Sequence, residues 1–258
     1  MTESTRSAYS VPAHAALQWW GRGLAFWKQA PLRITLWSLL PLVVEAVLQV
    51  LPDVGVVASK LLTPAASALV YLAFDGIQRR QPLSAAALAA RVRRIGVGGL
   101  LGLALVMFTI YIAQVVVGYL AYGAPALEVA LFGRTEVHRE LLDQRFLLML
   151  VLVGLVPGVL LLFVTPLVAL GGQSPMRAAS ISSATMLTSP AAYVVTYAVT
   201  AALLAAAIMW GRGVALLALV PWVFAVHFVA YRDVFGQFGR FEHPAGNGVV
   251  AVDGSRDE

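Results

Sequence analysis

Residues 32–74 read LRITLWSLLPLVVEAVLQVLPDVGVVASKLLTPAASALVYLAF and consist of two apolar runs joined by a short turn. The runs cover about 32–51 and 54–74, and Pro52 and Asp53 lie between them. A helix of about 17–25 mostly apolar residues is long enough to cross a lipid bilayer. The stretch therefore predicts an antiparallel hairpin of two transmembrane helices.

Four further apolar runs follow this hairpin, at about 95–122, 146–172, 190–210 and 213–230. Apolar residues make up 60% of the chain and charged residues 12%. Soluble proteins average about 45–50% apolar and about 25% charged residues. We therefore expect an all-α fold, a polytopic membrane helical bundle with six transmembrane helices in one domain spanning 11–236.

The segment 12–29 carries an apolar stripe at helical spacing together with Arg22 and Lys28. The stripe consists of Leu17, Trp20, Leu24 and Trp27. The segment is too short and too charged to cross a membrane, so we expect an amphipathic helix on the membrane surface. The alternative is that it extends the first spanning helix into solvent.

The remaining segments are more polar than the runs. Residues 175–188, and a small-residue stretch that opens at Gln81-Pro82, are further candidates for surface helices, which gives one to three such helices in total. Residues 1–10 and 237–258 are polar or rich in glycine and charge. We expect both to be disordered, the second as a cytoplasmic tail.

Basic residues are unequally shared among the segments that join the runs. Of the 18 arginines and lysines, Lys60 lies inside a run and four lie in the segments after the third and fifth runs. The other 13 lie in or around the segments on the opposite side of the membrane, which are those before the first run and after the second, fourth and sixth runs. The four are Arg134, Arg139, Arg145 and Arg212. Arginine and lysine are enriched in cytoplasmic segments. We therefore expect a multi-pass protein of the bacterial cytoplasmic (inner) membrane with both termini in the cytoplasm.

Glu45 and Lys60 are ionisable residues inside the first two runs, where a charge costs about 2.5–3.5 kcal/mol on insertion scales. Glu45 lies seven residues before Pro52, and Lys60 lies seven residues after Asp53. An antiparallel hairpin would place them at the same depth, roughly 10 Å from its turn. This candidate polar pair is either part of a substrate or proton path, or an ion pair that fixes the register of the hairpin.

Five arginines lie in the predicted cytoplasmic segment 75–94. They are Arg79, Arg80, Arg91, Arg93 and Arg94. Basic residues beside a membrane attract anionic lipid headgroups, which makes these arginines candidate headgroup contacts. The alternative is that they serve only to set the topology.

Motifs for cofactors, metals and catalysis are not found in the sequence. There is no cysteine, and the histidines at 14, 138, 227 and 243 are not paired at helical spacing. No phosphate-binding glycine loop and no serine nucleophile elbow occurs. The sequence therefore predicts no cofactor, no metal and no nucleic-acid partner, and it does not indicate an enzyme.

Several short motifs occur in an order that resembles a known family. They are Val11-Pro12-Ala13, Leu51-Pro52-x-x-Gly55, Pro64, Ser174-Pro175 with Ala178 and Ser180, and Tyr231-Arg232-Asp233-Val234-Phe235-Gly236. In these features, across about 11–236, the chain resembles a family of uncharacterised six-helix bacterial inner-membrane proteins without an assigned activity. The resemblance implies a helical bundle with cytoplasmic ends, and it implies no site residue.

Three functions remain open from the sequence. The first is a non-enzymatic inner-membrane component that supports envelope homeostasis or joins a membrane complex, with the bilayer, anionic headgroups and membrane proteins as partners. The second is a small-solute or ion transporter with its polar site near Glu45 and Lys60. The third is an enzyme or lipid-headgroup binder that uses the arginines of 79–94.

Overall fold

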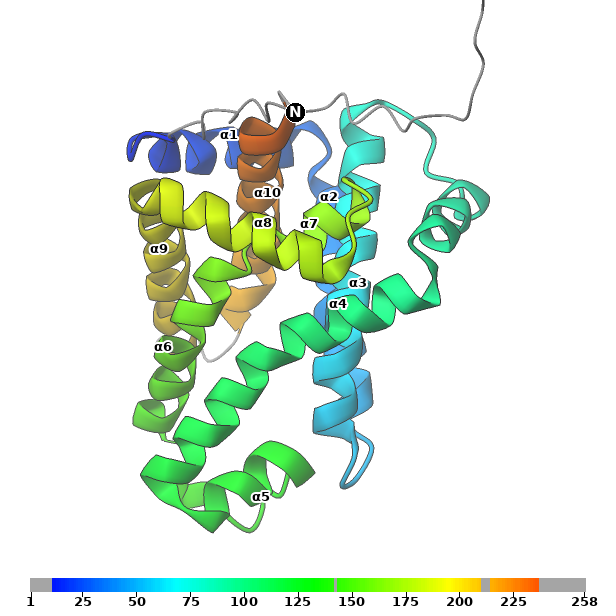
Figure 1. Cartoon of the computed structure of the whole chain (residues 1–258). Coiled ribbons are helices and arrows are strands. Elements are labelled where there is room, and N and C mark those ends of the chain that lie inside the picture. Colours follow the sequence, from blue (N-terminus) through cyan, green and yellow to red (C-terminus); the bar gives the residue numbers. More distant parts are fainter. Residues whose placement is uncertain (1–10, 142, 210–213, 237–258) are drawn as a thin grey trace, which may run out of the picture.

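The computed structural model describes residues 11–141, 143–209 and 214–236, and every regular element in these ranges is a helix (Figure 1). The helices long and apolar enough to cross a membrane are α2 (Pro31–Gln49), α3 (Gly55–Gln78), α4 (Ala85–Tyr122), α9 (Pro190–Met209) and α10 (Val214–Phe235). The prediction of an all-helical chain with several helices able to cross a membrane is thus confirmed for the described residues. The ends expected to be disordered, 1–10 and 237–258, lie outside the described residues.

The fourth apolar run differs from the expectation of one continuous helix. It forms α6 (Gln144–Leu160) and the short α7 (Val164–Ala169), separated at 161–163. Pro166 has no N–H to donate and is tolerated in the first turn of a helix, so it favours a new helix start at this point. The N–H of Phe163, freed by the break, donates to Ser182 Oγ at 3.1 Å.

The long helices are arranged as a closed ring. In the order α2, α3, α4, α6, α9 and α10, each helix packs against the next, and α10 packs against α2. α8 (Pro175–Thr188) contacts α4, α6, α7 and α9, and α5 (Ala124–Phe132) packs beside α3 and α4. α7 is almost wholly buried among α3, α4 and α8.

The arginine-rich segment of the sequence lies between α3 and α4. α3 continues past the predicted end of its run at residue 74 and so includes Asp75. α4 begins at Ala85, and its backbone leaves the helical conformation at Gly96, where φ is 72°. This break coincides with the predicted boundary between a short helix and the third run. Glycine adopts such a positive φ without the steric cost that other residues incur.

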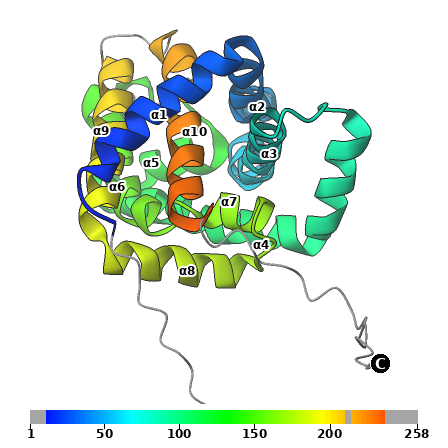
Figure 2. The same cartoon turned by 90° about the horizontal axis from the view of Figure 1, so that it is seen from above.

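α1 (Ala15–Gln29) lies across one end of the ring and packs mainly on α10 (Figures 1 and 2). Trp19 is fully buried in contact with the ring of Tyr193, and Trp20 packs edge-to-face on Trp222. Gly23 faces the backbone of Val226, which allows the two helices to approach closely. The first and last helices of the described chain therefore pack together.

We predict that this close approach makes Gly23 sensitive to a single added methyl group. A Cβ at position 23 would lie 2.7 Å from Val226 Cγ2 and 2.9 Å from the Val226 nitrogen, whereas a Cβ at Gly21 would meet nothing within 4 Å. Gly23→Ala should therefore cost about 1–3 kcal/mol through overpacking. Gly21→Ala, the matched control, should be neutral or stabilise the helix by up to about 1 kcal/mol. Unfolding of the purified protein, followed by tryptophan fluorescence, measures both, and equal effects would contradict the prediction.

Candidate functional site

Glu45 and Lys60 form an ion pair between α2 and α3, with Lys60 Nζ donating to Glu45 Oε1. Gln49 Nε2 also donates to Glu45 Oε1, at 3.1 Å. The side chains are 24% exposed for Glu45 and 33% for Lys60. The structure therefore brings this candidate pair together near the α2–α3 turn, where each charge is matched by the other.

The candidate arginines of the 79–94 segment divide into two groups. Arg79 and Arg91 bind inward to the carboxylate of Asp75, with Arg79 Nε 2.9 Å from Oδ1 and Arg91 Nη1 3.2 Å from Oδ2. Arg80, Arg93 and Arg94 are exposed and form no ion pair with the residues that the structure describes. The first group stabilises the fold, and the second group presents positive charge to the surroundings.

Asp75 is the centre of a polar network that the sequence analysis did not identify. Its side chain is only 8% exposed, and a third arginine, Arg232 of α10, places Nη1 3.6 Å from Oδ1. Arg91 also donates to the carbonyl of Leu72 and to Gln81 Oε1. In the sequence, the position of Asp75 after an apolar run and four residues before Arg79 could have indicated their contact. The contact of Asp75 with Arg232 gave no such signal, because Arg232 lies far away along the chain.

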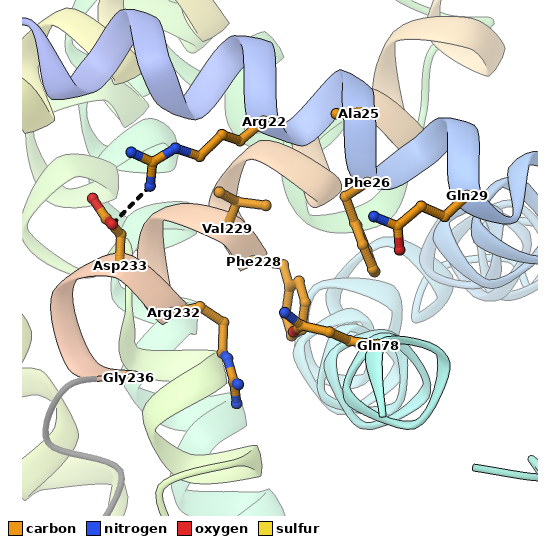
Figure 3. A pocket seen from close by; sticks show the side chains of 10 residues that line it. All are labelled: Arg22, Ala25, Phe26, Gln29, Gln78, Phe228, Val229, Arg232, Asp233 and Gly236. Carbon is orange, nitrogen blue, oxygen red and sulfur yellow. Dashed lines mark hydrogen bonds and ion pairs between the residues drawn. The ribbon is translucent and has the colours of Figure 1, made fainter. Parts of the chain in front are cut away.

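An open pocket of about 530 Å³ lies beside this network, between α1, α3 and α10 (Figure 3). Its polar lining residues are Arg22, Gln29, Gln78, Arg232 and Asp233. Its apolar lining includes Phe26 and Phe228, whose ring centroids are 5.1 Å apart. The pocket therefore combines cationic and amide donors with an aromatic wall.

Asp233 connects two walls of the pocket. It accepts a hydrogen bond from Trp19 Nε1 at 2.9 Å and from Arg22 Nη1 at 2.8 Å. Arg22 Nη2 in turn donates to Gln18 Oε1. These bonds join α1 to α10 and hold Arg22 at the rim of the pocket.

A third polar group lies on the segment after α4, at the end of the ring that holds the α2–α3 turn. Glu128 of α5 contacts the ring of His138 at 3.2 Å and Arg134 at 3.6 Å. The hydrogen bond with His138 lowers the pKa of the Glu128 carboxyl. Partial desolvation opposes this shift, and the positive charge of Arg134 adds to it. This group ties the loop after α5 to its helix.

We predict that the Glu45–Lys60 pair is energetically coupled. Glu45→Gln and Lys60→Met should each lower the free energy of unfolding, since each leaves one charge unpaired in an apolar helix. The double variant should lose less than the summed single effects, with a coupling of about 0.5–3 kcal/mol. The exposed pair Glu136–Arg139 is the control, with expected coupling near zero. Additive effects at Glu45 and Lys60 in a double-mutant cycle would show that the contact does not stabilise the hairpin.

The polar regions thus lie near opposite ends of α3, with Lys60 near its first turn and Asp75 near its last. Hydrogen-bond donors, an aromatic wall and space for a ligand occur together only at the Asp75 end among the sites described above. No protein-family model matches the chain, and no curated protein or solved structure matches it at a significant level. The chemistry of the residues themselves is therefore the basis for a functional proposal.

Proposed function

We propose that the chain is a non-enzymatic component of the bacterial cytoplasmic membrane that acts by binding, in envelope homeostasis or within a membrane complex. The observation that carries the proposal is the contrast between the two ends of α3. Glu45 and Lys60 neutralise each other at one end, whereas Arg80, Arg93 and Arg94 at the other end are exposed. Exposed cations beside apolar helices suit anionic lipid headgroups or an acidic surface of a membrane protein.

The proposed topology has six crossings, with α6 and α7 forming the fourth crossing together. α6 has 17 residues and would span about 26 Å, slightly less than the roughly 30 Å of a hydrocarbon core. α7 continues the path beyond the break at 161–163. An even number of crossings puts both termini on one side, and the arginine distribution favours the cytoplasm. α1 and α8 would then lie along the membrane surface on that side.

A small-solute or ion transporter is the second candidate. It is favoured by two features, the partly exposed ion pair of Glu45 and Lys60 and the broken α6–α7 segment. Transporters place substrate groups at interrupted helices and at ionisable residues inside the membrane. This candidate requires that the pair be reached by water or solute during a transport cycle.

Native mass spectrometry of the protein, extracted with its surrounding lipid, tests the two candidates. We expect retained anionic lipid or a protein subunit, and we expect Glu45→Gln to leave this retention unchanged. A stoichiometric small solute that is lost in Glu45→Gln but kept in Glu136→Gln would instead favour the transporter. If the protein retains no lipid and no protein subunit, the binding function is contradicted.

Single-cysteine labelling tests the topology, because the chain contains no cysteine of its own. Glu136 is 84% exposed and Ala89 is also exposed, so both positions should tolerate the change to cysteine. In spheroplasts, a membrane-impermeant maleimide should label Glu136→Cys directly and Ala89→Cys only after the membrane is permeabilised. The reverse pattern would invert the proposed orientation, and direct labelling of both would contradict a crossing by α4.

A further inference from the structure

We propose that the pocket between α1, α3 and α10 binds a phosphate ester, either the headgroup of an anionic phospholipid or a soluble organic phosphate. The inference deepens the proposed binding function by naming a site and a ligand class, and it rests on that function for the position of α1 at the cytoplasmic surface. Three observations support it: uncommitted donors, a local excess of positive charge, and apolar lining residues (Figure 3).

Arg232 supplies the strongest uncommitted donors of the pocket. Its Nη1 lies 3.6 Å from Asp75 Oδ1, which is beyond hydrogen-bond distance, and its side chain is 38% exposed. The Arg232 guanidinium makes no hydrogen bond with the described residues. A guanidinium offers a planar pair of N–H groups that matches two oxygens of a phosphate group.

Two amide side chains add neutral donors from the other walls. Gln29 extends from α1 and Gln78 from α3, and both line the pocket with Arg232 of α10. Neither amide makes a side-chain hydrogen bond with the part of the chain that the structure describes. Donors from three different helices are therefore free to bind one ligand.

The acidic groups at the pocket are already matched by cations. The carboxylate of Asp233 is held by Arg22 and by Trp19, and that of Asp75 faces Arg79, Arg91 and Arg232. Among the residues that line the pocket itself, Arg22 and Arg232 stand against Asp233, which leaves one positive charge in excess. This excess equals the charge of a phosphate diester, and Asp75 beside the pocket is matched by its own arginines.

The apolar part of the lining favours an ester over inorganic phosphate. Phe26 and Phe228 form the aromatic wall of the pocket but are only 4% and 1% exposed, whereas Ala25 and Val229 of the lining are more accessible. An apolar surface of this kind gains free energy by covering the carbon part of a ligand. The glycerol portion of a lipid headgroup, or the carbon skeleton of a small phosphate ester, supplies such a part.

The test is ligand titration of the full-length protein in detergent, read by native mass spectrometry. The probes are phosphatidylglycerol and glycerol 3-phosphate, with phosphatidylcholine as the zwitterionic comparison. We expect Arg232→Gln to weaken binding of the preferred phosphate probe about tenfold or more, as for loss of a charged hydrogen bond. Gln78→Leu should weaken it about threefold to tenfold without changing the charge. Arg139→Gln removes the same charge from an exposed position at the other end of the ring and should change binding less than twofold.

The outcomes separate the sources of the ligand. Binding of phosphatidylglycerol that glycerol 3-phosphate does not displace identifies a lipid headgroup site, and the reverse preference identifies a soluble ester. The proposal is overturned if Arg139→Gln weakens binding as much as Arg232→Gln, or if neither phosphate probe binds more tightly than phosphatidylcholine. Should Arg232→Gln unfold, Gln78→Leu carries the test, since it alters none of the ion pairs.

Failure of this inference and failure of the proposed function give different results. If lipid or subunit retention from the native membrane persists in Arg232→Gln and Gln78→Leu, the protein binds partners elsewhere and only the pocket is wrongly assigned. If the purified protein binds the phosphate probe at the pocket but retains no lipid or subunit from its membrane, the site stands and the envelope role does not.

Discussion

The carboxylate of Asp233 holds α1 and α10, the first and last helices of the described chain, together. The arrangement of the pocket between α1, α3 and α10 depends on it. Trp19 and Arg22 of α1 both donate to this one group. Without it, α1 would be held to α10 by apolar packing and one 3.3 Å hydrogen bond from Trp222 Nε1 to the Trp20 carbonyl. Apolar packing resists sliding less than directed hydrogen bonds do. Because α10 also closes the ring against α2, fixing α1 on α10 fixes the position of α1 over the whole bundle. The pocket exists because a helix is held across the ends of two others.

The parts of this structure that could be predicted are those that depend on local sequence. The short turn at Pro52 and Asp53 leaves little freedom of register, so equal spacing on both sides was enough to pair Glu45 with Lys60. The break in α4 at Gly96 likewise followed from a change in composition along the chain. Apolar run lengths set by the bilayer predicted the helices themselves.

The parts that could not be predicted depend on residues that are remote in sequence. Thr63-Pro64 and Thr165-Pro166 are the same dipeptide, yet α3 continues through Pro64 whereas Pro166 lies in the first turn of α7. The difference comes from Ser182 of α8, which accepts the backbone N–H of Phe163 and so stabilises a break there. In the same way, Arg79 beside Asp75 was visible in the sequence, but Arg232 and the pocket required the packing of α10.

The contact between α1 and α10 also has a consequence for how the protein is made. A ribosome releases α1 before any of the long helices, and α10 is the last helix that it releases among those described. Until α10 is made, therefore, the aromatic face of α1 lacks the α10 side of its packing, which is Trp222 for Trp20 and Phe228 for Phe26. Among the aromatic rings of the described residues, only Tyr193 of α9 and Phe74 of α3 contact this face from earlier in the chain. A chain that lacks α10 leaves much of this aromatic face uncovered, which gives proteases and chaperones a physical sign of incomplete folding. Docking of α10 and burial of this face are then the same event.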